Sequence, residues 1–180
     1  FGDDTGSLYE GTVTDLVEEW LPRFEVKTDE TDPDYGPLLA LAKALQKPDD
    51  ELVDALEPVL NIDRYITYWA LEVLLVHRDG YASSHNNFYV YFDPEDGGRG
   101  VFIPWGIDKV PAEDAAETLD SYVNAQLPRR LSRIPETAAL MEAELNRLVT
   151  EVWDEDALLA SLDSFSAQVE SAQEGGAAEK

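Results

Sequence analysis

Residues 77–108 read HRDGYASSHNNFYVYFDPEDGGRGVFIPWGID, and this stretch decides the fold. It contains two runs of alternating residues, Phe88–Phe92 and Gly100–Pro104, and a period of two predicts strands. The linker DPEDGG between them is rich in Pro, Asp and Gly, which is typical of a tight connection between antiparallel strands. The sequence therefore predicts a β-hairpin whose open ends, at Asn87 and Asp108, lie close together.

The segment before this stretch is predicted to be a helix from Ile62 to about Val76, with Asn61 as its N-cap. Its apolar residues cover most of the circumference, which is typical of a buried central helix. Such a helix would hold His77-Arg78-Asp79 at its end on rigid support, and Asp79 would reach the open end of the hairpin.

The remaining chain is mostly helical in pattern. Trp69 and Trp105 are both expected to lie in the core. We therefore predict a mostly helical α+β domain with one central β-hairpin, formed by residues 1–174, and a frayed tail at 175–180 after Gly175-Gly176. Further helices are predicted at about 35–46, 49–57, 126–132, 136–153 and 154–174, and short strands at 7–10 and 23–27.

The composition excludes several classes of protein. The apolar content of 44% excludes general disorder, and the chain has no cysteine for disulfides or thiolate metal sites. A net charge of -25, from 38 acidic and 13 basic residues, argues against nucleic acid as a partner, because phosphate backbones need clustered Lys and Arg. No run of eighteen apolar residues occurs, so no membrane span is expected. The acidity itself is typical of a highly solvated surface.

Two carboxylates and a carboxamide meet at the predicted mouth of the hairpin, from Asp79, Asn87 and Asp108, with Asn86 as the alternative to Asn87. Oxygen ligands of this kind suit a hard cation such as Mg²⁺. Asp108 follows an apolar strand and is expected to be partly buried, so that it must be paired or bound to metal. As an ion pair, its alternative partners are Lys109, Arg78 and Arg99.

The motif DGY-x4-NNFYVY, followed by FIPWGID, resembles the CotH kinase family, first known from spore coat protein H. The resemblance runs from Leu8 to about Val169. The family pattern ends in P-W-D-x-D, and here Gly106 replaces the first Asp while Asp108 provides the second. The resemblance implies a kinase-like C-terminal lobe that uses Mg²⁺ and ATP.

The resemblance also implies roles for individual residues. Asp79 would be the general base, and Asn87 and Asp108 the metal ligands. The alternative for Asp79-Gly80 is a simple turn at the helix end, with Gly80 in the left-handed region. The spelling His-Arg-Asp matches protein kinases, but their metal-binding Asn comes five residues after the Asp, where this chain has Ser84. The additional candidates at the site are Asn86, His85 (as a phosphate contact or a surface residue) and Arg78.

The function implied is transfer of phosphate from Mg-ATP to Ser or Thr of a protein. The chain has no Gly-rich loop to cover phosphates, so we expect it to be the catalytic-lobe part of a longer protein and to be inactive by itself. The alternative is a non-catalytic structural or coat-assembly domain that retains the fold. A secreted, cell-surface or coat-associated location is one that the resemblance allows.

Overall fold

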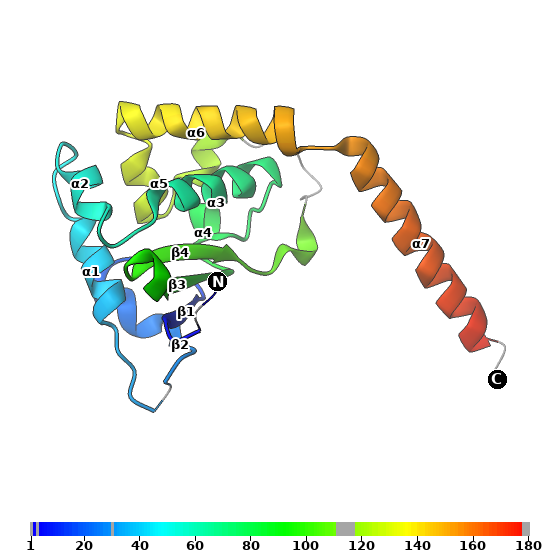
Figure 1. Ribbon diagram of the computed structural model, residues 1–180, viewed down its shortest axis with the longest axis horizontal. Helices are drawn as coiled ribbons and strands as arrows, with labels where there is room; N and C mark the ends of the chain where they lie inside the picture. The colour runs from blue at the N-terminus through cyan, green and yellow to red at the C-terminus, as the bar shows by residue number, and fades with distance from the viewer. Residues whose placement is uncertain (1, 3, 30, 111–117, 178–180) are drawn as a thin grey trace. The chain divides into compact units, whose positions relative to one another are not determined.

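The computed structural model describes residues 2, 4–29, 31–110 and 118–177, and it is mostly helical around one antiparallel sheet (Figure 1). The predicted α+β class is confirmed. The chain divides into two compact units, residues 1–145 and residues 146–180. Within the described residues, no helix combines the length and the apolar character that a membrane crossing requires.

The sheet has four strands in the order β2-β1-β3-β4. Its centre is the predicted hairpin, in which Phe88 pairs with Pro104 and Asp93 with Arg99. The two short strands predicted upstream also form, and they extend the hairpin on one side. The strands are β1 (Ser7–Gly11), β2 (Glu25–Val26), β3 (Phe88–Asp93) and β4 (Arg99–Pro104).

The hairpin turn uses the chemistry that its sequence indicates. The Asp93 side chain accepts a hydrogen bond of 3.0 Å from the Glu95 amide, which starts the short 3-10 helix η2 (Pro94–Asp96). Gly97 and Gly98 follow at φ of 68° and 77°, in the left-handed region that glycine enters without a steric penalty.

One face of the sheet carries an aromatic core. Alternation along β3 turns Phe88 toward this face, where its ring stacks on Phe102 of β4 at 5.6 Å between centroids. The helix α3 (Ile62–Leu74) contributes Tyr65, whose ring lies 5.0 Å from Phe102. Figure 1 shows α3 alongside the sheet. The core therefore joins the central helix directly to the hairpin.

The ends of α3 follow the predicted signals closely. The Asn61 side chain accepts a hydrogen bond of 3.0 Å from the Arg64 amide, as an N-cap does. The helix ends at Leu74 rather than Val76, because Val76 takes a positive φ of 54°.

The two tryptophans differ in their surroundings. Trp69 is buried and its indole N–H donates to the Tyr122 carbonyl at 2.8 Å, so its predicted core position is confirmed. The same prediction for Trp105 is wrong, since this side chain is 53% exposed. Trp105 lies one residue beyond the last pair of the sheet, and its ring meets the edge of Tyr89 at 5.5 Å.

The outer edge of β4 contacts the segment that leads into α3. The Gly100 amide donates to the Val59 carbonyl at 2.9 Å, and the Gly100 carbonyl accepts from the Asn61 amide at 3.0 Å. These two bonds form an isolated parallel bridge between Leu60 and Gly100.

The helices predicted at about 35–46, 49–57 and 126–132 lie near their predicted positions. Arg130 joins its own helix to the segment between the first two, because its guanidinium donates to the Lys47 carbonyl at 2.6 Å and pairs with Asp49 at 2.8 Å. The bounds are η1 (Glu18–Arg23), α1 (Gly36–Ala44), α2 (Leu52–Leu56), α4 (Tyr81–Ser84), η3 (Ile107–Lys109), η4 (Leu119–Tyr122), α5 (Gln126–Leu131) and α6 (Pro135–Arg147, which runs into the second unit).

The second unit contains the one-turn π-helix η5 (Leu148–Val152) and the helix α7 (Glu155–Ala177). Asp154 caps α7, as its side chain accepts from the Ala157 amide at 2.9 Å. The helix continues through Gly175 and Gly176, so the end predicted there is wrong. Large exposed apolar residues in the described part of α7 include Leu158, Leu159, Leu162, Phe165 and Val169.

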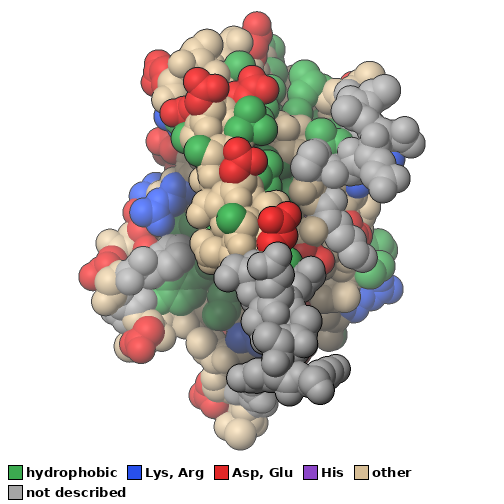
Figure 2. Space-filling model, turned by 90° about the vertical axis from the view of Figure 1, so that its right-hand side faces the viewer, with side chains coloured by type: hydrophobic (Ala, Val, Ile, Leu, Met, Phe, Trp, Pro, Cys, Tyr) green, Lys and Arg blue, Asp and Glu red, His purple; other side chains and the backbone are tan. Residues whose placement is uncertain are grey.

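The acidic side chains do not gather in one patch on the face shown in Figure 2. Asp and Glu are spread over that face, with few Lys or Arg between them. This distribution fits a solvated acidic surface.

Candidate active site

Asp79 is exposed and lies in the turn that leaves the central helix. The turn differs from the alternative drawn from the sequence, because Gly80 has a φ of -87° and is not left-handed. The left-handed residue is Val76, and β-branched residues adopt this conformation rarely. The turn is closed by Ser84, whose hydroxyl donates to the carbonyl of half-buried Arg78 at 2.6 Å.

The helix α4 follows, where the sequence predicted only a polar loop. Tyr81 and Ala82 are fully buried and hold this single turn in place. The helix ends at Ser84, and its C-cap His85 has a φ of 58°, which turns the chain back toward Asp79. Asn86 and Asn87 come next and lead into β3.

Both asparagines bind Asp79. The Asn87 side-chain amide donates to Asp79 Oδ2 at 2.8 Å and to the Asp79 carbonyl at 3.0 Å. The Asn86 amide donates to Asp79 Oδ1 at 3.1 Å. Asn87 has a φ of 52°, which asparagine tolerates better than most residues. The carboxylate of Asp79 is therefore fixed through both of its oxygens.

The end of the second hairpin strand lies against Asn87. The Trp105 amide donates to the Asn87 carbonyl at 3.1 Å. Gly106 has a φ of 63°, and a Cβ atom at this position would lie 2.8 Å from Asn87 Cγ. Position 106, which is Asp in the family pattern, thus has no room here for a side chain while Asn87 keeps its place.

Asp108 lies two residues further on, in η3. It is exposed, so the expectation of partial burial is wrong: the apolar strand ends at Pro104, and Asp108 belongs to the following turn. Arg99, one of its alternative partners, pairs instead with Asp96. The polar sequence of residues 109–122 predicts a long loop over the site, and residues 111–117 of this segment lie outside the described residues.

The donor atoms suit a hard cation. Because the Asn87 amide nitrogen is turned to Asp79, the oxygen on the same carbon is directed away from that carboxylate. An amide oxygen and the nearby carboxylate oxygens are ligands that Mg²⁺ uses together with substrate phosphates. Among the residues that the structure describes, no group of three or more His, Cys, Asp or Glu could hold a metal ion, so a site here needs the Asn side chain.

Two buried carboxylates hold this loop, and the sequence analysis missed both. Glu72 on α3 accepts from the amides of Tyr81 and Ala82, each at 2.8 Å. Asp15 accepts from the Tyr81 hydroxyl at 2.8 Å, and His85 Nε2 lies 3.5 Å from it. His85 is thus directed to a buried carboxylate. The available signal for Glu72 was an acidic residue in the middle of an apolar helix.

Burial changes the pKa of two groups behind the site. It raises the pKa of the Glu72 carboxyl to about 7, although hydrogen bonds from Tyr68, Ala82 and Tyr81 favour the carboxylate. It lowers the pKa of His77, against the opposing effect of the Asp79 charge. His77 Nδ1 lies 3.7 Å from Glu72 Oε1, so the two groups face each other under the loop.

Replacing Glu72 with Gln should change how stability depends on pH. The folded state holds the Glu72 proton more tightly than the unfolded state, so this group stabilises the fold below pH 4.5 and loses that contribution as the pH rises through about 7. The unfolding free energy of wild type relative to Glu72→Gln should fall by about 2 kcal/mol between pH 5.5 and pH 8. Urea melts over this range measure the difference.

The His77 contribution has the opposite sign, since a lowered pKa stabilises the fold above pH 6.5 and is lost on acidification. Because His77 faces Glu72, the comparison is made in a His77→Gln background, which removes this contribution from both proteins. A difference that does not vary with pH would contradict the raised pKa of Glu72.

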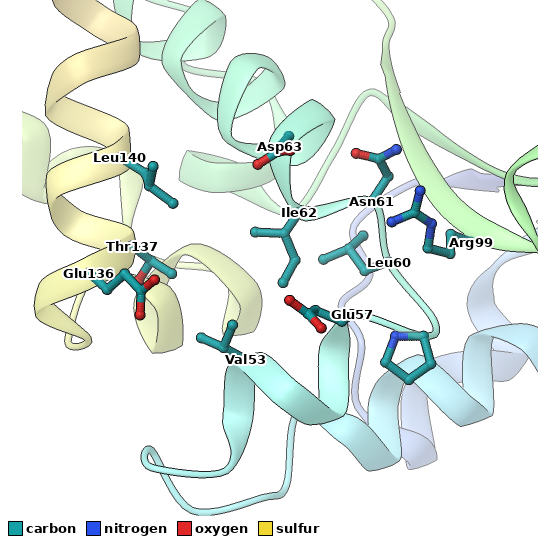
Figure 3. Close-up of a pocket in the computed structure, with 11 residues that line it drawn as sticks. Val53, Glu57, Leu60, Asn61, Ile62, Asp63, Arg99, Glu136, Thr137 and Leu140 are labelled. Carbon is teal, nitrogen blue, oxygen red and sulfur yellow. The ribbon is translucent and has the colours of Figure 1, made fainter.

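A cavity of about 630 Å³ lies elsewhere in the first unit, where α2, the start of α3, β4 and α6 meet (Figure 3). Figure 3 shows apolar Val53, Ile62 and Leu140 with acidic Glu57 and Glu136 around it. Asp79, Asn87 and Asp108 do not line this cavity. The candidate site is therefore identified by the contacts of Asp79 and not by this cavity.

Comparison with known families gives one match over nearly the whole chain. The model described as CotH kinase protein matches residues 3–174. A search of curated proteins gives no match. The matched range contains Asp79, the two asparagines and Asp108.

Proposed function

Because this chain belongs to the CotH kinase family and has a kinase-like function, we propose that it is an Mg-ATP-dependent protein kinase that phosphorylates Ser or Thr. The observation that carries the proposal is the bonding of Asp79 by Asn86 and Asn87. A carboxylate held through both oxygens at the end of a buried helix is positioned as a catalytic base must be.

Asp79 accepts the proton of the substrate hydroxyl in this mechanism. Its exposure lets a Ser or Thr side chain of another protein approach, and its fixed orientation aligns the hydroxyl oxygen with the phosphate to be transferred. Asn86 holds Asp79 Oδ1, while its own oxygen accepts from the Val13 amide at 3.2 Å. We assign Asn86 to positioning the base rather than to the metal.

Asn87 and Asp108 would hold the metal in the proposed site. The Asn87 oxygen is directed away from Asp79, and Asp108 is exposed two residues after the glycine that touches Asn87. Mg²⁺ bound there would supply positive charge that offsets the negative charge of the phosphate being transferred. In so acidic a protein, this local positive charge is also what allows a triphosphate to approach.

Replacing Asp108 with Ala should lower phosphate transfer by about 10²–10³-fold, because one of the groups that stabilise the transferred phosphate is lost. The measurement is transfer of radiolabel from ATP to a Ser-rich peptide by the full-length protein. Asp54→Ala, which removes an exposed carboxylate from α2, is the matched control and should transfer at the wild-type rate. Full activity in Asp108→Ala would overturn the metal assignment.

The second candidate is a binding domain without catalysis, and Gly106 is the observation that favours it. This position lacks the carboxylate of the family pattern, and its backbone leaves no space for one beside Asn87. The residues 1–180 also contain no Gly-rich loop, so we expect them to bind Mg-ATP weakly by themselves. A full-length protein that binds Mg-ATP but transfers no phosphate would favour the binding domain.

A further inference from the structure

Glu72 lies behind the candidate site and points from α3 into the loop that carries Asp79. Its side chain is only 2% exposed, and its two oxygens accept from the amides of Tyr81 and Ala82. These are the first two residues of α4, where the amides have no partner within their own helix. Glu72 therefore caps α4 from a different helix.

Gly80 brings this loop unusually close to Glu72. A Cβ atom at position 80 would lie 2.1 Å from Glu72 Oε1 and 2.7 Å from His77 Nδ1, so any other residue would force the loop away. Gly80 follows Asp79 directly in the chain. The backbone of Gly80 therefore packs directly against the Glu72 carboxylate.

We propose that Glu72 is a positioning residue that fixes Asp79 for catalysis. The proposal rests on the function proposed above, since it assigns Glu72 a part in the reaction of Asp79. The asparagines hold the carboxylate of Asp79 from the hairpin side. From the helix side, Glu72 holds the backbone amides of Tyr81 and Ala82, two and three residues after Asp79. Both contacts are needed to keep the side chain from moving with the loop.

The test compares two variants that each remove one hydrogen bond from the same carboxylate. In Glu72→Gln, the side-chain oxygen can still accept from the Tyr81 amide. The side-chain NH₂ group then lies opposite the Ala82 N–H, and because both groups are donors, that hydrogen bond is lost. Tyr68→Phe removes the bond of 2.6 Å from the Tyr68 hydroxyl to Glu72, which does not involve α4. It is the matched control.

We expect Glu72→Gln to lower kcat about 10–100-fold with KM for ATP within about twofold, because Asp79 is displaced while the metal ligands remain. Tyr68→Phe should keep kcat within about twofold. Gly80→Ala forces the same loop away from Glu72 and should lower kcat as Glu72→Gln does. A wild-type kcat in both Glu72→Gln and Gly80→Ala would overturn the proposal.

Hydrogen exchange gives a readout that does not require activity. In Glu72→Gln, the amides of residues 79–85 should exchange about tenfold faster, while those of Val101 and Phe102 in the sheet stay unchanged. Faster exchange throughout the protein would assign Glu72 to general stability and overturn the positioning role. A wild-type protein without transfer would overturn the proposed function, whereas local fast exchange would still show that Glu72 fixes the Asp79 loop.

Discussion

Replacing Asp79 with Asn should lower kcat for phosphate transfer by about 10²–10⁴-fold, the range that general base catalysis supplies. Asn has the shape of Asp, and its side-chain oxygen can still accept a hydrogen bond from the side-chain amide of Asn86 or Asn87, so the loop should stay folded. It cannot accept the proton of the substrate hydroxyl. KM for ATP should change little, since the proposed metal ligands Asn87 and Asp108 remain. Steady-state transfer of radiolabel to a Ser-rich peptide measures both quantities.

The matched control is Glu95→Gln, which removes the same charge at the turn, the opposite end of the hairpin. It should leave kcat unchanged. An Asp79→Asn protein that keeps half of the wild-type activity would show that Asp79 is not the base. Equal losses in Asp79→Asn and Glu95→Gln would point to overall charge rather than to the site.

Replacing Trp69 with Ala should lower the unfolding free energy by about 3–5 kcal/mol. The indole is 4% exposed, stacks near Tyr65 at 6.4 Å and donates to the Tyr122 carbonyl, which would be left without this partner. The measurement is a urea melt followed by circular dichroism, which does not depend on the loss of tryptophan fluorescence.

Trp105→Ala is the control with the same change in side chain. Trp105 is more than half exposed, so its loss should lower the unfolding free energy by no more than about 1 kcal/mol. Equal effects at the two positions would contradict the central place of α3 in the core.

The hairpin was predictable because its signals are local. Turn residues and a period of two lie within seventeen residues of one another, and the observed strands Phe88–Asp93 and Arg99–Pro104 differ from the prediction by one residue each. The contact of Asp79 with Asn87 could also be predicted from the sequence. It follows from the hairpin geometry once the helix is seen to deliver Asp79 to the open end.

The parts that were missed depend on contacts between distant residues. The polar segment after Asp79 gave no helical period, and α4 forms because Glu72 and Asp15 bind it. Trp105 is apolar and follows a strand, but the strand ends before it. Whether a side chain such as that of Trp105 is buried depends on the residue at which the strand ends. The local sequence pattern predicts such ends less well than it predicts the strand itself.

The edge strands of the sheet limit how this protein can associate with other copies of itself. An open strand edge is a template on which a strand of another molecule can add, which is how aggregates grow. At one edge, β2 has only two residues. At the other, the outward-facing groups of Gly100 are taken by Val59 and Asn61, and Pro104 has no N–H to offer. Together with mutual repulsion at a net charge of -25, these edges should keep concentrated solutions of the folded protein free of fibrils.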